Sequence, residues 1–211
     1  MLILSIYVFK FMDKKVKYNY VENSLLKSLN LLKELTESEI FIKNTIKASD
    51  LIIDSIKSNN CIFSAGNGGS AAHSQHFAAE LICRFNFDRN PLPAMALTND
   101  SSVITAISND YGYENIFERQ ISGLSKKGDV FIGLTTSGTS TNIIKAFKRA
   151  KLLNLKTIAI CGANGIPKSD FIPDVEISIP CKVTSLTQEM HGITTHLICD
   201  IVEKTIFGEI K

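Results

Sequence analysis

The chain has 211 residues, of which 45% are hydrophobic and 21% are charged, and its formal net charge at pH 7 is +2. This composition is ordinary for a globular protein, and the length suits one large domain or a compact domain with an extension. So small a net charge, without a long run of Lys and Arg, does not predict a nucleic-acid-binding protein.

The first segment, "MLILSIYVF", is apolar but too short to cross a bilayer. It has neither a basic start nor a small-residue cleavage site, so it makes a poor signal peptide, and we expect no membrane partner. A more polar segment, "MDKKVKYNY", begins at Met12, so Met1 and Met12 are both candidate start residues. We treat residues 1–22 as an N-terminal extension that need not be ordered, and residues 23–211 as a single domain.

Two helices are predicted between about Asn23 and Asn59. The stretch "NSLLKSLNLLKEL" places its leucines close to one helical stripe, and Asn23 is a plausible N-cap. The stretch "SEIFIKNTIKASDLIIDSIK" has apolar residues at similar spacing and predicts the second helix. Packing against the domain is the simplest role for both helices, and a subunit contact is the alternative.

From Cys61 onward, short apolar runs alternate with helical patterns. Strands are predicted over residues 61–66, 93–98, 129–136, 156–163 and 174–180. Helices are predicted over residues 70–85, 101–110, 141–153 and 185–207. Apolar, β-branched strands that alternate with helices indicate an α/β fold with a five-stranded parallel sheet covered on both faces.

Polar loops follow four of the predicted strands: "SAGNGGS", "TND", "TTSGTS" and "CGANG". In parallel sheets, ligands bind beyond the carboxyl ends of the strands, so these loops predict one binding mouth. The "TTSGTS" loop offers several hydroxyl groups at the start of a helix, where free amides favour an anion such as a phosphate. A Ser/Thr-capped helix start without a ligand is the alternative.

The "GNGGS" loop fits neither a Walker motif nor a dinucleotide fingerprint, so a nucleotide site is not expected. Its glycines can bring the backbone and the Asn67 amide close to a small polar ligand, and a simple strand-to-helix turn is the alternative. Two residues of the following helix, His76 and Glu80, are four apart and therefore neighbours. Such a pair alone is common on helix surfaces, and His196 alone, in an apolar stretch, would more often be a core residue.

Five cysteines stand in the chain, an odd number without any C-x-x-C pair. Several lie in apolar runs, so they predict buried free thiols, a reducing compartment and a cytoplasmic protein. The five are Cys61, Cys83, Cys161, Cys181 and Cys199.

Four segments together resemble the phosphoheptose isomerase family: "GNGGSAAHSQHFAAEL", "RNPLPAMALTNDSSVITAISNDYGYENIFERQ", "GDVFIGLTTSGTSTNIIKAFKRAK" and "TQEMHGITTHLICDIVE". The similarity runs from about residue 20 to the C-terminus. It implies the sugar isomerase (SIS) fold, a flavodoxin-like three-layer sandwich, here with an N-terminal helical extension. It also implies conversion of D-sedoheptulose 7-phosphate to D-glycero-D-manno-heptose 7-phosphate through an enediol, the first step toward the heptose of lipopolysaccharide or capsule.

The same resemblance implies a homotetramer with active sites at subunit interfaces and one zinc ion in each. The implied metal ligands are His76, Glu80, Gln188 and His196, and the implied base and acid are Glu80 and His196. The implied phosphate loop contains Thr135, Thr136, Ser137 and Ser140. The remaining implied substrate-binding residues are Asn67, Gly68, Gly69, Ser70, Asn109, Asp110 and Gln188.

Gln188 and His196 are eight residues apart, about 12 Å along an ideal helix, so two such side chains cannot easily meet one ion. Either Gln188 precedes the regular helix, or different subunits supply the two side chains. We expect the second, and one straight helix supplying both to one ion would contradict it.

The chain also departs from the family pattern. His73 and Ser185 stand where aspartate is usual, Thr139 where asparagine is usual and Thr135 where serine is usual, and the loop after "CGANG" is short. Ser185 and the short loop bear on which sugar is accepted and which anomer is formed.

Three alternatives to this enzyme remain. One is a non-catalytic protein of the same fold that binds a replication initiator, another is a sugar-phosphate-binding regulator, and the third is an isomerase of another phosphosugar. Glu80 and His196 favour an enzyme over the first two, because neither a platform nor a regulator needs an acid–base pair.

Overall fold

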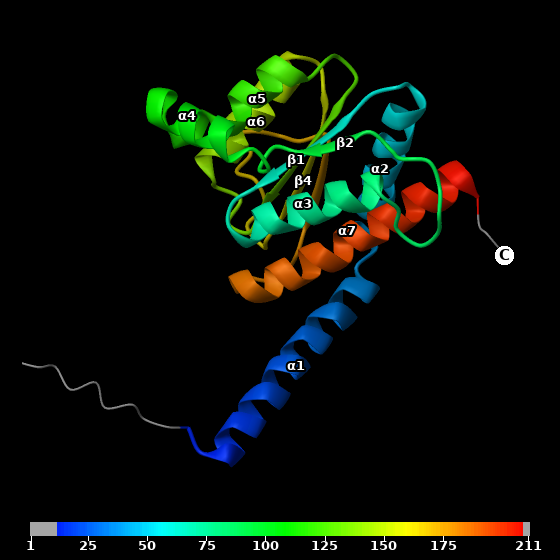
Figure 1. Ribbon diagram of the computed structural model, residues 1–211. Coiled ribbons are helices and arrows are strands. Elements are labelled where there is room, and N and C mark those ends of the chain that lie inside the picture. The colour runs from blue at the N-terminus through cyan, green and yellow to red at the C-terminus, as the bar shows by residue number, and fades with distance from the viewer. Residues whose placement is uncertain (1–11, 209–211) are drawn as a thin grey trace, which may run out of the picture.

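The computed structural model describes residues 12–208, and its core is a five-stranded parallel sheet (Figure 1). The strands are β1 (Ile62–Gly66), β2 (Ala94–Ala96), β3 (Val130–Thr135), β4 (Lys156–Cys161) and β5 (Val175–Ser178). They are ordered β2-β1-β3-β4-β5, and every neighbouring pair is parallel. The predicted α/β class is confirmed, and this strand order is that of flavodoxin-like doubly wound sheets.

Helices cover both faces of the sheet, as the alternation of strands and helices predicts (Figure 1). They are α1 (Lys14–Glu37), α2 (Glu39–Lys57), α3 (Gly69–Ile82), α4 (Ser101–Tyr111), α5 (Ile116–Leu124), α6 (Thr141–Leu152) and α7 (Thr184–Phe207), with a 3-10 turn η1 (Tyr113–Asn115). Helices α2, α3 and α7 share one apolar core with the sheet, and α5 and α6 share the other.

The sheet separates the two cores, and the pleat of each strand directs alternate side chains into one core or the other. In β3, Ile132 and Leu134 face the core beneath α2, α3 and α7, whereas Phe131 faces the core beneath α5 and α6. Successive side chains of a strand point to opposite faces, so a strand buried on both faces is apolar at every position. All six residues of β3 are buried, which is why its sequence shows a continuous apolar run.

The N-terminal helix is longer than the sequence analysis predicted. Helix α1 begins at Lys14, so Asn23 lies inside the helix and is not its N-cap. No Gly or Pro occurs between Lys14 and Asn23, so nothing in the sequence stops the helix there. The predicted boundary between residues 22 and 23 therefore falls within α1, and the part of the extension over residues 1–11 lies outside the described residues.

Helix α5 was missed by the sequence analysis. Its signal is present, because Phe117 and Ile121 are four residues apart and both are buried in the core shared with α6. The helix is short and follows directly on η1, so it shows only two turns of periodicity. Within residues 12–208, no helix is long and apolar enough to cross a membrane.

The five cysteines are free thiols, as predicted. Cys161 and Cys199 are buried, and burial raises the pKa of the Cys161 thiol to about 12, so this thiol stays protonated. The expectation of burial is wrong for Cys83, which is exposed because it follows the last turn of α3.

A buried ion pair joins the segment after α3 to α7. Arg89 Nε lies 2.9 Å from Glu203 Oε1, and the two side chains are 2% and 1% exposed. The Glu203 carboxylate also accepts hydrogen bonds from the main-chain amides of Phe85 and Asn86, and the guanidinium donates to the carbonyls of Glu80 and Leu81. Every member of this network thus has partners, which a buried charge requires.

We expect Glu203→Leu to destabilise the protein by about 3–5 kcal/mol, because it leaves the Arg89 guanidinium buried without its counter-charge. Replacing both residues, by Arg89→Met with Glu203→Leu, should recover much of that loss. Urea unfolding followed by circular dichroism measures both, and Glu39→Gln, in an exposed pair with Lys43, is the control with little effect. A single variant as stable as the wild type would contradict the expectation.

The same pair gives stability a pH dependence. Burial alone would raise the pKa of Glu203, but hydrogen bonds from Asn86, Phe85 and Arg89 hold this pKa below its ordinary value. The stability that the pair adds to the folded state is therefore complete above the ordinary carboxyl pKa. It is lost as the pH falls through the lowered pKa of Glu203. The stability difference between wild type and Glu203→Leu should shrink over that acidic range.

Candidate active site

Helices α3 and α7 pack against each other, and their facing side chains form the centre of the candidate site. The contacts advance in the same direction along both helices: Gly69 lies against Gln188, His73 lies beside Gly192, and His76 meets His196. The two helices therefore run parallel here. This register brings residues 120 apart in the chain into contact, which the spacing within either helix could not reveal.

His76, Glu80 and His196 form a compact cluster. His76 Nε2 lies 2.9 Å from His196 Nε2 and 3.2 Å from Glu80 Oε1. One potential ligand atom from each residue lies within 4.8 Å of the other two. His76 and His196 are exposed and the Glu80 side chain is 21% exposed, so a small molecule can reach the cluster.

The donor set suits a transition-metal ion. Two imidazole nitrogens and one carboxylate oxygen are the ligands of many catalytic zinc sites, which keep a further position open. The two Nε2 atoms face each other, so either one carries a proton for the other or both turn lone pairs toward a cation. The residues present therefore fit a metal, and His76, Glu80 and His196 would hold it.

Gln188 does not join this cluster. A Cβ atom added at Gly69 would lie 2.6 Å from Gln188 Oε1, which places the Gln188 side chain over the start of α3. His76 and His196 lie about two helical turns further along their helices. The structure thus brings together three of the four residues expected to bind metal.

The segment after α3 supports the cluster from one side. The Phe85 ring packs against His196 at 5.4 Å between centroids, and Arg89 donates to the main-chain oxygen of Glu80. The ion pair of Arg89 with Glu203 holds this segment against α7. Phe85, Arg89 and Glu203 were not expected at the site, because nothing in their spacing signals a contact across more than 100 residues.

A second histidine pair lies deeper between the same helices. His191 is fully buried, and burial lowers its pKa to about 4, so this ring is neutral near pH 7. The Cys161 carbonyl partly offsets that shift, although neither ring nitrogen reaches hydrogen-bonding geometry. Burial also lowers the pKa of His73. From the sequence, His73 stood out only as a departure from the family pattern.

The "TTSGTS" loop forms a compact cup at the start of α6. Thr135 Oγ1 lies 3.1 Å from Ser140 Oγ and 3.4 Å from Ser137 Oγ. Because Ser140 turns its hydroxyl to Thr135, it makes no side-chain cap to the first turn of α6. Gly138 has φ +76°, and a Cβ atom there would lie 1.7 Å from the Gly165 carbonyl oxygen. The loop therefore requires glycine at this position and leaves a helix start suited to an anion.

The other expected substrate-binding residues lie on two segments. Asn67 and Gly68 form the turn from β1 into α3, and Gly69 and Ser70 are the first residues of α3. Gly68 has φ +55°, and Ser70 is buried. Asn109 and Asp110 are exposed at the end of α4, and Asn109 Nδ2 donates to Asp110 Oδ1. Tyr113, in the following η1, reaches back to Asn67 Oδ1 at 3.0 Å. Thr136 is half-buried in the "TTSGTS" loop.

Comparison with known proteins identifies the family to which the chain belongs. A model of the SIS domain family matches residues 25–162. The phosphoheptose isomerase of Sulfurimonas denitrificans is 43% identical over 190 residues, which cover 90% of this chain and 97% of that protein. The phosphoheptose isomerase of Geotalea daltonii is 47% identical over 160 residues, covering 76% and 83%. This chain belongs to the phosphoheptose isomerase family.

Solved structures of this family have the same fold. The phosphoheptose isomerase of Neisseria gonorrhoeae superposes with a TM-score of 0.81 at 34% identity, covering 89% of this chain and 98% of that one. The enzyme of Francisella tularensis gives a TM-score of 0.84 at 30% identity, with the same coverage. The resemblance drawn from the sequence motifs is confirmed.

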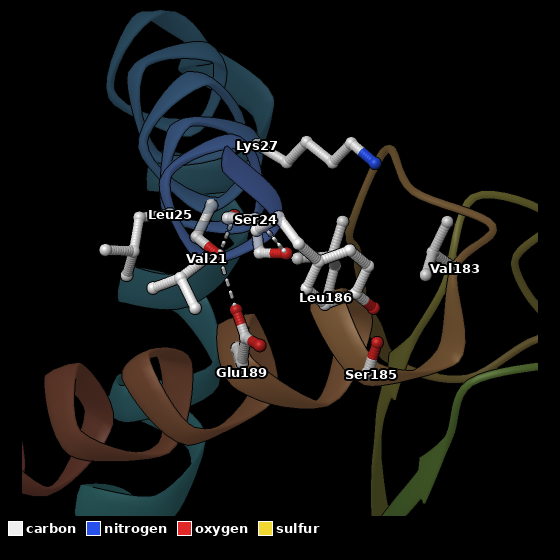
Figure 2. Close-up of a pocket in the computed structure, with 10 residues that line it drawn as sticks. Val21, Ser24, Leu25, Lys27, Val183, Ser185, Leu186 and Glu189 are labelled. Atoms are coloured by element: carbon white, nitrogen blue, oxygen red, sulfur yellow. Dashed lines mark hydrogen bonds between the residues drawn. The ribbon is translucent and has the colours of Figure 1, made fainter. Parts of the chain in front are cut away.

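This member of the phosphoheptose isomerase family also carries a cavity of about 610 Å³ away from the cluster (Figure 2). The cavity lies between α1 and the start of α7, and neither Glu80 nor His196 lines it. Ser185 and Glu189 point into it from α7, and Ser28 donates to Glu189 at 2.7 Å. Ser185, one of the departures from the family pattern, therefore lies beside α1.

Proposed function

We propose that the protein is an aldose–ketose isomerase that converts D-sedoheptulose 7-phosphate to D-glycero-D-manno-heptose 7-phosphate. The observation that carries this proposal is the meeting of Glu80 and His196 from facing helices in a chain of the phosphoheptose isomerase family. A carboxylate and an imidazole within 4.8 Å of each other can serve as base and acid on neighbouring atoms of one substrate.

The isomerisation moves one hydrogen between C1 and C2. Glu80 removes the proton from C1 of the ketose while His196 gives a proton to the oxygen on C2, which yields the enediol. Glu80 then returns the carbon-bound proton to C2, and His196 takes the proton from the oxygen on C1. Each general acid or base contributes about 10²–10⁴-fold to the rate.

The phosphate group would bind in the loop before α6. Ser137 and Ser140 offer hydroxyl donors, and the uncapped start of α6 offers main-chain amides and the positive end of the helix dipole. Such a site can bind a phosphate without a lysine. Asn67, Gly68, Gly69 and Ser70 would line the sugar chain, together with Asn109 and Asp110.

The metal in this proposal is zinc, one per active site. His76, Glu80 and His196 would hold it, and Gln188 from a neighbouring subunit would complete the set, since Gln188 of the same chain lies two helical turns away. When bound, a zinc ion supplies Lewis-acid polarisation of the sugar carbonyl. Neither Glu80 nor His196 can be a firm zinc ligand and a proton carrier at the same moment, so both side chains move off the ion when substrate enters.

The protein would assemble as a homotetramer, because a single chain leaves much apolar surface on α1. This helix projects from the domain, and of its residues only Leu31 and Leu35 are buried (Figure 1). Its exposed large apolar side chains are Val16, Tyr18, Tyr20, Val21, Leu25, Leu26 and Leu29. A contiguous apolar surface of this kind marks a protein interface. Subunits joined through it would share their active sites.

The biological setting follows from the reaction. A heptose 7-phosphate is a precursor for heptose in lipopolysaccharide or capsule, and its synthesis would take place in the cytoplasm. The free thiols agree with a reducing compartment.

We expect Glu80→Gln and His196→Ala each to lower kcat by at least about 10²-fold, because each removes one proton-transfer group. The assay is conversion of sedoheptulose 7-phosphate followed by NMR, with Glu39→Gln as the exposed-glutamate control. Unchanged turnover in both variants would overturn the assignments. Turnover only on other ketose phosphates would identify a different isomerase, and no turnover with tight binding of a protein partner would favour a platform.

We expect the purified protein to contain about one zinc per chain, and His76→Ala to weaken zinc binding by more than about tenfold, because it removes one of three clustered ligands. Metal content measured by mass spectrometry after dialysis against a chelator tests this. Gln75→Ala, on the neighbouring residue of α3, is the control. Full activity in metal-free protein would remove zinc from the mechanism and leave the isomerase standing.

We expect a solution mass of about 93 kDa, four times the 23.3 kDa of one chain. Leu25→Lys on α1 should lower it, because a charge would be buried in the interface. Light scattering during size-exclusion chromatography measures the mass, and Leu152→Lys, at an exposed leucine of α6, is the control. A monomeric wild type would contradict the assembly and the shared site.

A further inference from the structure

Two asparagines from distant segments pair at the carboxyl edge of the sheet. Asn67 lies in the turn after β1, and Asn142 is the second residue of α6. Asn67 Nδ2 donates to Asn142 Oδ1 at 2.9 Å, and Asn142 Nδ2 donates to Asn67 Oδ1 at 2.8 Å. Asn142 is 2% exposed, and neither the motifs nor the proposed mechanism assigns it a role.

The orientation of the Asn142 amide is determined by its own helix. Its Oδ1 accepts a hydrogen bond from the main-chain amide of Ile143 at 3.0 Å, which this amide shares with the Ser140 carbonyl at 3.0 Å. If the Asn142 amide were flipped, its NH₂ group would face that N–H donor, which is unfavourable. Because Asn142 is oriented in this way, the reciprocal pair also determines which end of the Asn67 amide faces it.

Asn67 therefore has only one hydrogen-bonding group left. Its Oδ1 already accepts from Asn142 and, at 3.0 Å, from the Tyr113 hydroxyl. One hydrogen of Nδ2 is used by Asn142 Oδ1, and a carboxamide offers two donor hydrogens and two acceptor lone pairs in total. What remains is a single N–H, so Asn67 can donate to a ligand and cannot accept from one.

The pair also connects the two halves of the proposed substrate site. Asn142 follows Ser140 of the phosphate loop by two residues, and Asn67 begins the turn that is proposed to line the sugar. Because the amide pair is partly shielded from water, its two hydrogen bonds hold these segments at one spacing. A substrate with its phosphate in the loop would thus meet the Asn67 N–H at a set distance along its chain.

We propose that Asn142 is a positioning residue for substrate recognition, which holds Asn67 so that one N–H donates to an acceptor oxygen of the sugar chain. This inference rests on the proposed function, because it needs a sugar phosphate bound at the loops that follow β1 and β3. Asn142 itself touches Asn67 and Ile143, not the substrate.

Calorimetric titration of the full-length protein with two probes tests the inference. Sorbitol 6-phosphate is an open-chain polyol phosphate that cannot isomerise, and inorganic phosphate occupies only the phosphate loop. Asn142→Ala should weaken binding of the polyol phosphate by about tenfold, since Asn67 loses its orientation, and should change phosphate binding by less than about twofold. In turnover assays KM should rise more than kcat falls.

Two further variants keep the test independent of folding. Tyr113→Phe removes one bond to Asn67 at an exposed residue outside the phosphate loop, and it should weaken only the polyol phosphate, to a smaller extent. Asn115→Ala truncates a neighbouring amide whose partners are Tyr111 and Lys145, and it should change neither probe.

An equal loss of both probes in Asn142→Ala would mean that Asn142 only supports the start of α6, and it would overturn the inference. Unchanged polyol phosphate binding in both Asn142→Ala and Tyr113→Phe would also overturn it, as would a wild type that binds neither probe. A wild type that binds the polyol phosphate selectively through Asn142, but does not turn over sedoheptulose 7-phosphate, would end the isomerase proposal and leave this inference standing.

Discussion

The packing of α3 against α7 is the contact on which the rest of the site depends. Both helices lie on the same face of the sheet and run parallel, so their side chains meet in register from Gly69 and Gln188 to His76 and His196. The buried pair of Arg89 and Glu203 closes the far end of this contact and bonds to the carbonyl of Glu80. Such a pair is a modest source of net stability but holds one geometry, because any other arrangement would leave a charge unpaired.

The sheet supplies the second half of the site by bringing loops to one edge. In a parallel sheet all strands end on the same side, so the turn after β1 and the loop after β3 become neighbours. The hydrogen bonds between Asn67 and Asn142 cross between these two loops. The helix start proposed to bind phosphate and the proposed acid–base cluster are therefore both attached to this sheet, and the chain of a sugar phosphate would extend between them.

A single chain leaves this site open. His76 and His196 are exposed, Gln188 lies away from them, and the long apolar face of α1 has little to pack against. The cavity that Ser185 lines sits between α1 and α7 rather than at the cluster (Figure 2). These features have one explanation in the proposed assembly, in which neighbouring subunits cover α1 and complete the metal site.

The sequence by itself determined the strands, most helices and the chemistry of the loops. Short, nearly continuous apolar runs such as "VFIGLT" favour strands buried on both faces, and glycine and hydroxyl residues after them signal polar turns. The short helix α5 was not predicted, because it shows too few turns of periodicity. The start of α1 was predicted too late, because the sequence has no stop signal before Asn23.

Spacing along the chain could not decide which distant residues meet, although the family resemblance implied that His76, Glu80 and His196 share one site, and only the tertiary structure shows the contact. Helical periodicity relates residues three or four apart, so it placed Glu80 beside His76 but carried no information about His196, Phe85 or Glu203. Nor could it pair Asn142 with Asn67, since that contact depends on the order of β1 and β3 in the sheet. Side-chain type is written in the sequence, whereas contacts across 75 to 120 residues arise from how whole helices and strands pack.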